Sequence, residues 1–400
     1  MTPQVKQRIE QIRRGEVPEG YKKTKVGIVP DEWNEECLGK YLQEYKELSN
    51  DIENYPVYSS SRQGLIPQSQ YYDNREAVET NLGYKIVPNG YVTYRHMSDD
   101  DIFHFNVNQT GSAVLVSSEY PVFTSTKKGD LGYLIPMLNG TARFRYFCRT
   151  QKMGGTRTRL YYKNLCTYKT AFATLPEQKK IAKILSAQDK IIALKEKLIE
   201  EKKRQKKHLM QQILNNKAVK SKFSSHWNTV ELNDVFDYVQ PTKYLVESTD
   251  YSNAYTTPVL TAGKSFVLGY TNETNGIYDQ VPVVIFDDFT TDSKYVDFPF
   301  KAKSSAMKIL KAKTNYDIKF AFELLQNINY IVGGHERHWI SIFSQLTVDV
   351  PPYEAQLKIS KIIQNTDKEI ELLEKDLIQE KQKKKALMHL LLTGIVRVDI

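Results

Sequence analysis

The sequence predicts a mixed α/β protein in which two globular domains are separated by two long antiparallel α-helices. The helices would form a coiled-coil spacer with an internal pseudo-twofold repeat. Three observations carry this prediction: a segment that occurs twice, an apolar heptad pattern inside each copy, and β-prone runs outside the copies. The predicted parts are an N-terminal helix and lead-in at 1–28, a first domain at 29–174, a first repeated helix at 175–222, a second domain at 223–350 and a second repeated helix at 351–400.

The repeat appears when the sequence is compared with itself. A shift of about 178 positions aligns the segment beginning at Gln178 with the segment beginning at Gln356, and about 17 of roughly 37 positions are identical. A weaker match precedes each copy and pairs Trp33 with Trp227. The chain therefore alternates a variable domain with a repeated segment, twice.

Each repeated segment predicts one long helix. Neither copy contains Gly or Pro, and about 37 residues at 1.5 Å each would span roughly 55 Å. Pro176 and Pro351–Pro352 mark the two entrances, and Gly394 marks the end of the second helix. Apolar residues step by four and three along both copies, as in a helix–helix seam. The seam residues, which also form the candidate partner-docking set, are Ile181, Leu185, Ile192, Ile199, Leu209, Ile359, Ile363, Ile370, Leu373, Leu377 and Leu387.

Four charged residues interrupt this seam: Lys202, Lys206, Glu380 and Lys384. We expect these positions either to face solvent or to leave surface for a partner. The simplest arrangement packs the two helices against each other, and the alternative packs each helix on its own globular domain.

The remaining sequence predicts globular domains with short strands and occasional helices. Strands are predicted at 89–94, 114–116, 120–123 and 281–286, and helices at 4–14 and 320–325.

Composition limits the function classes. The 400 residues carry a formal net charge of +9, with 26 tyrosines and 16 phenylalanines, a balance that weakly favours nucleic-acid binding. No apolar run reaches about 18 residues, and the first residues lack the apolar core of a secretory signal. Three cysteines without C-x-x-C spacing argue against a disulfide framework and a thiolate zinc site. We expect a cytoplasmic protein that contacts no membrane.

Basic residues gather in one part of the first domain. Between Asp130 and Glu177 there is no acidic residue. Arginines can pair with phosphates or read guanine edges, and glycines let a backbone approach a duplex. The candidate DNA contacts there are Arg143, Arg145, Arg149, Lys152, Gly154, Gly155, Arg157, Arg159 and Lys163. The alternative is an ordinary basic hairpin at the domain edge.

A second glycine pair lies at the corresponding place of the second domain, about 22 residues before Gln356. It supplies the candidate contacts Gly334, His335, Arg337 and His338. Ser60, Arg62, Lys264 and Lys303 complete the candidate DNA-binding set.

Four near-matches to catalytic or metal motifs fail on their chemistry. Asp349 is separated from Pro351–Pro352 by Val350, whereas adenine methylases need the acid or amide directly before the prolines. Asp31, Glu44 and Lys46 fit a loose nuclease pattern that the second copy lacks. Residues 262–265 end like a phosphate loop without its first glycine, and His335 with His338 lacks further metal ligands. We therefore expect no catalytic residue and no metal site.

The chain resembles the specificity subunits of type I restriction–modification systems over nearly its full length. The resemblance rests on the Pro-Asp-Glu-Trp start at 30–33, the Leu-Pro-Glu-Gln-Lys-Lys-Ile-Ala stretch at 175–182, the run at 381–388 and the ending at 391–397. Asn215-Asn216-Lys217 departs from the Leu-Thr-Gly pattern after the first helix, and Tyr353-Glu354-Ala355-Gln356 departs at the start of the second.

The resemblance implies a non-catalytic subunit that chooses the DNA address. Each domain would be a target-recognition domain that reads one half of an asymmetric split sequence in double-stranded DNA. The helices would set the gap between the half-sites and dock two methylation subunits, with two restriction subunits completing the assembly. S-adenosylmethionine, ATP and Mg would bind those partners, and this chain would bind no cofactor.

Two other classes stay open. A bipartite DNA-binding module serving another DNA-modifying or anti-phage effector would share every feature except the partner. A coiled-coil scaffold without a DNA role would not need the arginine-rich stretch.

Overall fold

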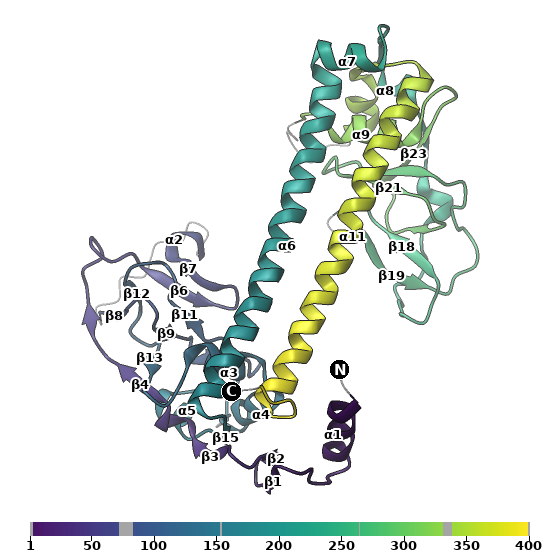
Figure 1. Cartoon of the computed structure of the whole chain (residues 1–400). Coiled ribbons are helices and arrows are strands. Elements are labelled where there is room, and N and C mark those ends of the chain that lie inside the picture. Colours follow the sequence, from purple (N-terminus) through teal and green to yellow (C-terminus); the bar gives the residue numbers. More distant parts are fainter. Residues whose placement is uncertain (1–2, 72–82, 153, 264, 331–337, 399–400) are drawn as a thin grey trace. The chain divides into compact units, whose positions relative to one another are not determined.

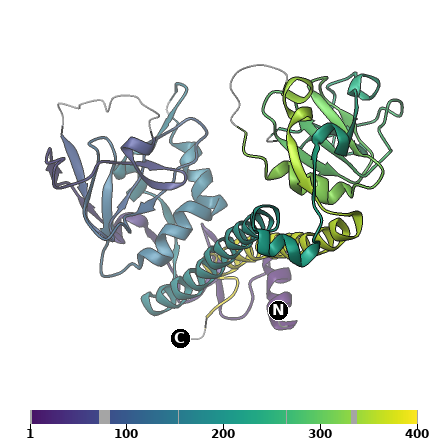
Figure 2. The ribbon, with the colours of Figure 1, turned by 90° about the horizontal axis from the view of Figure 1, so that it is seen from above.

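The computed structural model describes residues 3–71, 83–152, 154–263, 265–330 and 338–398 (Figure 1). It contains two compact units: Met1–Lys195 with Asp376–Ile400, and Glu196–Lys375. Each unit holds one strand-rich part and a segment of both long helices, α6 (Leu175–Asn215) and α11 (Tyr353–Leu392). Within each unit taken by itself, the strand-rich part lies to one side of its two helix segments (Figure 2).

The first unit is built from short antiparallel strands. One sheet has the order β11 (Asn106–Val107), β9 (Val92–Thr93), β13 (Val122–Ser125) and β4 (Leu42–Tyr45), and another has β12 (Val114–Ser117), β8 (Tyr84–Val87) and β5 (Leu48–Ser49). Two-stranded ribbons join β1 (Tyr21–Thr24) to β2 (Gly27–Pro30), β3 (Asn34–Cys37) to β15 (Lys169–Phe172), β6 (Tyr58–Ser61) to β7 (Gly64–Pro67) and β10 (Met97–Ser98) to β14 (Thr158–Arg159). The helices are α1 (Pro3–Arg13), α2 (Gln68–Tyr71), α3 (Leu131–Gly140), α4 (Ala142–Thr150) and α5 (Tyr162–Cys166), with a 3-10 turn at Leu38–Lys40.

The second unit has a similar plan, except that one strand pair of its three-stranded sheet is parallel. Its four-stranded sheet has the order β17 (Phe236–Val239), β23 (Met307–Ala312), β20 (Val283–Asp287) and β21 (Ser293–Val296), and its three-stranded sheet has β19 (Val267–Thr271), β18 (Thr257–Leu260) and β22 (Lys301–Ala302). A ribbon joins β16 (Asn228–Glu231) to β24 (Thr347–Val350). The helices are α7 (Lys217–Phe223), α8 (Leu232–Val235), α9 (Ile318–Gln326) and α10 (His338–Ser341), with 3-10 turns at Pro241–Tyr244 and Phe343–Gln345.

One ribbon marks the same joint in both units. The strand after Trp33 pairs with the strand that leads into α6, with Asn34 opposite Phe172. The strand after Trp227 pairs with the strand that leads into α11, with Asn228 opposite Val350. The weak sequence echo around the two tryptophans therefore corresponds to a repeated strand pair at the base of each domain.

A buried glutamine ties each long helix to its domain. Gln178 donates to the carbonyl of Ala173 (2.9 Å) and accepts from the backbone N–H of Asp130 (3.0 Å), the residue that precedes α3. Gln356 makes the same two bonds, to the carbonyl of Pro351 (2.9 Å) and from the N–H of Asp317 (2.9 Å), the residue that precedes α9. Because a buried amide must satisfy its donors and acceptors, these bonds fix the first turn of each long helix.

The predicted helix seam is apolar at its ends. The seam residues given above are all buried or half-buried in the structure. Ile181 and Leu185 join the core of the first unit together with Leu391 and Leu392, from the far end of α11. Ile359 and Ile363 join a core of the second unit with Met210 and Ile213, from the far end of α6. The helices therefore pack both on each other and on the globular parts, and the two arrangements expected from the sequence occur together.

The expectation for the charged seam positions is wrong. These residues pair with side chains of the facing helix instead of facing solvent or leaving surface for a partner. In the second unit Lys202 pairs with Glu369 (2.7 Å), and Lys206 pairs with Asp367 (2.6 Å). In the first unit Lys384 pairs with Asp189, and Glu380 accepts a hydrogen bond from Gln188 (2.6 Å). The Lys206–Asp367 and Lys384–Asp189 pairs are related by the shift of the repeat. The antiparallel helix segments of each unit therefore meet through the same ion pair.

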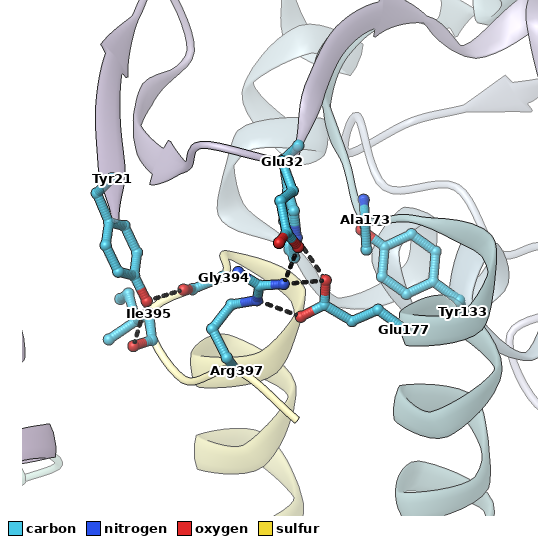
Figure 3. A network of polar contacts seen from close by, with 9 residues as sticks. Tyr21, Glu32, Tyr133, Ala173, Glu177, Gly394, Ile395 and Arg397 are labelled. Carbon is cyan, nitrogen blue, oxygen red and sulfur yellow. Dashed lines mark hydrogen bonds and ion pairs between the residues drawn. The ribbon is translucent and has the colours of Figure 1, made fainter. Parts of the chain in front are cut away.

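In the first unit, hydrogen bonds and ion pairs join residues 394–397 to the first turn of α6 and to residues near the start of the chain (Figure 3). We call this cluster the polar clasp. The side chain of Glu177 is fully buried and accepts from Trp33 Nε1 (2.8 Å) and Arg397 Nε (2.6 Å). Arg397 also pairs with the exposed carboxylate of Glu32 (2.7 Å), and the Tyr21 hydroxyl donates to the carbonyl of Gly394 (2.9 Å). The sequences at 30–33, 177 and 394–397 thus meet at one point.

Gly394 is required at this clasp for two reasons. Its φ is +73°, in the left-handed region that favours glycine. A Cβ atom there would lie 2.5 Å from Pro30 Cδ and 3.2 Å from the Trp33 ring.

Most predicted elements agree with the structure to within a few residues. The strands predicted at 114–116, 120–123 and 281–286 correspond to β12, β13 and β20, and the helices predicted at 4–14 and 320–325 correspond to α1 and α9. The strand predicted at 89–94 shrinks to β9, behind a turn in which Gly90 has a φ of +84°. Helix α4 has no counterpart in the prediction, which assigned its arginines to DNA contacts or to a basic hairpin at the domain edge.

We predict that Arg397→Met lowers the free energy of unfolding by about 3 kcal/mol, because the carboxylate of Glu177 then stays buried without its cation. Denaturant titration of the full chain measures this change. Glu32→Gln removes the exposed partner of the same arginine and should cost no more than about 1 kcal/mol. Equal losses for the two variants would contradict the assignment of Glu177 as the anchor.

Candidate nucleic-acid interface

Two arginines that are distant in sequence meet at one acidic turn of the first unit. The turn follows β10 and contains Asp99, Asp100 and Asp101, the last with a φ of +62°. Arg62, from the β6–β7 hairpin, pairs with Asp100 (2.6 Å). Arg157, which follows the glycine pair, donates from Nε to Asp99 (2.8 Å). Two of the predicted DNA-contacting arginines therefore pair with neighbouring carboxylates of this turn.

The turn has its own internal hydrogen bonds. The Ser98 hydroxyl donates to Asp100 (2.8 Å) and accepts from the N–H of Ile102 (3.1 Å). Partial burial raises the pKa of Asp100, but hydrogen bonds from Ser98 and Arg62 outweigh burial, so that pKa lies below its ordinary value. The carboxylate is therefore ionised at neutral pH and keeps its hold on Arg62.

A hollow of about 460 Å³ opens beside the turn. Its walls include Ser61, Arg62, Gln63, Arg95, Asp99 and His104. Burial, and next the charge of Arg62, lower the pKa of His104. The hollow thus offers guanidinium and amide donors, an imidazole that is neutral at neutral pH and the carboxylate of Asp99, which are groups that pair with base edges.

The other basic candidates of the first domain are exposed. Arg145 and Arg149 lie one turn apart on α4, whose Phe144 and Cys148 are buried in the core. Lys152, Arg159 and Lys163 are also exposed. The two glycines, Gly154 and Gly155, have φ values of +68° and +85°, which explains why glycine occupies both positions.

Two candidates are placed differently from the prediction. Arg143 is exposed, but its guanidinium donates to the carbonyl of Val26 in the β1–β2 turn, so it serves the fold. Ser60 is 3% exposed and accepts from Asn106 Nδ2 (2.8 Å). Its hydroxyl therefore holds the β6–β7 hairpin that carries Arg62, and it does not reach the surface.

In the second unit several candidates lie outside the described residues: Lys264, Gly334, His335 and Arg337. Lys303 is half-buried, and its ammonium lies over the Tyr251 ring (5.8 Å). His338 is 2% exposed, and its backbone N–H donates to the carbonyl of Asp288 (2.9 Å). The side chain of His338 is thus an internal residue, contrary to its prediction as a surface DNA contact.

Asp288 forms the centre of a buried cluster behind His338. It is 1% exposed, pairs with Lys308 (3.3 Å) and accepts from the N–H of Trp339 (2.8 Å). Each side chain is thus the other's partner of opposite charge inside the domain.

Sequence reasoning missed the carboxylates that hold the arginines. Asp99 and Arg157 are 58 residues apart, and no spacing rule links them. The available signal was the run of three aspartates at 99–101, in a domain whose last 46 positions before Glu177 hold no acid. Such a run next to an arginine-rich stretch indicates pairing, although the partners become clear only in the fold.

A second apolar row lies on the long helices outside their seam. Ile184 and Ile362 occupy equivalent positions of the repeat and are 37% and 40% exposed. Leu194 and Leu372 are also equivalent and are 67% and 66% exposed. Equal exposure at equivalent positions provides each unit with a similar apolar surface.

Acidic residues from two of the near-matches to catalytic motifs form hydrogen bonds or ion pairs with neighbouring side chains. Asp349 accepts from Lys220 (2.6 Å) and Thr229 (2.7 Å), and the hydrogen bond from Lys220 lowers the pKa of its carboxyl group. Glu44 pairs with Lys46 (3.0 Å). Within the described ranges, no group of three or more His, Cys, Asp or Glu could hold a metal ion, and no helix is long and apolar enough to cross a membrane.

Comparison with known proteins identifies relatives of one kind. The family model described as type I restriction modification DNA specificity domain matches residues 39–204 and 224–381. The Escherichia coli type I restriction enzyme EcoR124I/EcoR124II specificity subunit is 47% identical over 147 residues, which is about a third of each chain (34% of this one and 36% of the relative). The putative MjaX specificity subunit of Methanocaldococcus jannaschii is 24% identical and is matched over 95% of this chain and 97% of its own.

Two solved structures share the fold. The type I restriction–modification S subunit from M. genitalium has a TM-score of 0.57 at 13% identity, and the match covers 92% of this chain and 96% of that one. A chain from a structure on complex assembly and conformational transition of the type I system has a TM-score of 0.55 at 10% identity, covering 92% and 99%.

Proposed function

This chain belongs to the family of type I restriction–modification DNA specificity subunits, and we propose that it reads an asymmetric split target in double-stranded DNA, one half-site with each globular domain. The proposal rests on the repeat: a buried glutamine joins each domain to a long helix in the same way. The charged contacts of the domains differ, because the first pairs Arg62 and Arg157 with exposed carboxylates and the second pairs Asp288 with Lys308 in its interior. Two unlike reading surfaces on one repeated frame suit two unlike half-sites. The helices would set the gap between the half-sites, which B-DNA geometry relates to the helical turn.

The chain carries no chemistry of its own in this proposal. It would dock two methylation subunits through its helices, and two restriction subunits would complete the complex. S-adenosylmethionine, ATP and Mg would be bound by those partners. The equal exposure of Leu194 and Leu372, and of Ile184 and Ile362, supports two copies of one partner, because a repeated surface can bind the same surface twice.

The decisive experiment is a methylome. The chain is expressed with its methylation subunit in a host that lacks adenine methylation, and modified adenines are mapped by long-read sequencing. We expect one split motif with a fixed gap that disappears when this chain is omitted. Soluble, associated proteins that yield no motif would contradict the proposal.

For DNA contact, we predict that Arg157→Glu with Arg159→Glu weakens binding of a duplex carrying the motif at least about tenfold at physiological salt, because phosphate contacts supply most of the affinity. The slope of the logarithm of the binding constant against the logarithm of the salt concentration should also become shallower, by the equivalent of about one to two phosphate contacts. Fluorescence anisotropy at several salt concentrations measures both quantities. The control, Lys6→Glu with Arg13→Glu, makes the same charge change on exposed residues of α1 and should leave binding nearly unchanged. Equal binding by the two double variants would favour a scaffold without a DNA role.

For docking, we predict that Leu194→Asp with Leu372→Asp abolishes co-purification of the methylation subunit while DNA binding by this chain persists. A charge at the centre of an apolar contact is strongly unfavourable, whereas both positions tolerate a charge when exposed to water. Leu194→Asp alone should retain one methylation subunit, which native mass spectrometry counts. Full retention of two subunits by the double variant would assign the docking surface elsewhere or favour a different effector.

A further inference from the structure

The acidic turn at Asp99 and Asp100 is an unexpected feature of a DNA-reading surface. Carboxylates near phosphates oppose binding, so their presence on such a surface requires another benefit. Both residues are exposed at their side chains, Asp99 by 70% and Asp100 by 43%, and both hold arginines that are themselves more than half exposed. Exposed ion pairs contribute little to stability, so the fold alone does not explain them.

A backbone hydrogen bond close to the acidic turn has a counterpart in the second unit, where it forms without these carboxylates. In the first unit the N–H of Leu160 donates to the carbonyl of His96 (2.8 Å), and in the second the N–H of His338 donates to the carbonyl of Asp288 (2.9 Å). Leu160 and His338 each lie 18 residues before the glutamine that begins their repeated segment, Gln178 or Gln356. The same attachment is therefore made in both domains by main-chain atoms, and in the second domain the nearby carboxylate of Asp288 is turned inward to Lys308.

Among the described residues, each pairing occupies only part of the guanidinium. Arg157 uses Nε toward Asp99, and Arg62 uses one terminal nitrogen toward Asp100. An arginine offers five N–H donors in a rigid fork, so donors remain on both side chains for a ligand. Holding the fork in place also removes rotamer freedom that binding would otherwise have to restrict.

We propose that Asp99 and Asp100 are positioning residues that set the base preference of the first domain, by aiming Arg157 and Arg62 at base edges beside the hollow that Arg95 and Gln63 help to line. A fixed arginine fork matches guanine O6 and N7, whereas a free arginine binds any phosphate within reach. The carboxylates themselves repel phosphate and can accept from cytosine or adenine amino groups. The turn thus lowers the affinity for DNA of any sequence and raises the discrimination between bases. This inference rests on the proposed function and names the residues that carry it in the first half-site.

The test compares methylomes of complexes that contain the wild-type chain or Asp99→Asn. In the variant the half-site read by the second domain and the gap should be unchanged. At one or two positions of the other half-site, preference for the correct base should fall about five- to twentyfold, which is within the range of one bidentate contact. Binding to unrelated duplex should stay equal or become tighter. The control Glu10→Gln removes one exposed negative charge that is paired with Arg14 in the same unit and should leave the motif intact.

Two further variants separate positioning from folding. Arg157→Lys keeps the charge but loses the fork, and it should relax the same motif positions as Asp99→Asn. The double variant should be no more relaxed than either single one, because both act through one contact. A purely structural role would instead lower methylation at all sites together and lower the melting temperature.

The outcomes distinguish this inference from the proposed function. A clear wild-type motif that Asp99→Asn leaves unchanged at every position would overturn the inference alone. Additive effects of Asp99→Asn and Arg157→Lys would overturn it as well. A wild-type complex that yields no split motif would overturn the proposed function and the inference together.

Discussion

The buried amide of Gln178, and its repeat in Gln356, is the constraint on which the rest of the structure depends. Each side chain is almost fully buried, at 1% and 2% exposure, so its donors and acceptor must be satisfied inside the protein. Each satisfies them with the strand that enters the long helix and with the residue that begins the domain's own helix, α3 or α9. The glutamine therefore links strand, domain helix and long helix at one point. A residue of another shape would leave backbone groups unpaired at that joint.

The ion pairs between the helix segments have a different role. Lys206 lies between Asp367 and the nearly buried Glu323, and Lys384 repeats the pair with Asp189 in the other unit. Burial raises the pKa of Glu323, although Lys206 opposes that effect. A partly buried ion pair adds little net stability compared with apolar packing, but only one alignment of two helices satisfies it. The polar positions of the seam thus specify how the segments align, while the apolar ends of the helices supply most of the burial.

The two units differ where function would require them to differ. The strand pairs at Asn34 and Asn228, the glutamine joints and the Lys–Asp pairs recur with the same partners. Other charged contacts do not recur: in the first unit Arg62 and Arg157 pair with exposed carboxylates, and in the second Asp288 is buried against Lys308. Shared interior contacts preserve the frame, and unlike surface contacts leave each domain free to recognise its own ligand.

The sequence by itself determined the repeat, the two long helices, their apolar seam and the family, because these depend on local periodicity and on spacing that remains visible along the chain. It also located the arginine-rich stretch, but it did not predict helix α4 or the burial of Ser60 and His338. Only the tertiary structure decided which charges meet: Asp99 with Arg157, Asp100 with Arg62, and Glu177 with Arg397 and Trp33. These contacts join residues tens to hundreds of positions apart. Long side chains pair with whatever the packed backbone brings within a few ångströms, and no local pattern encodes that proximity.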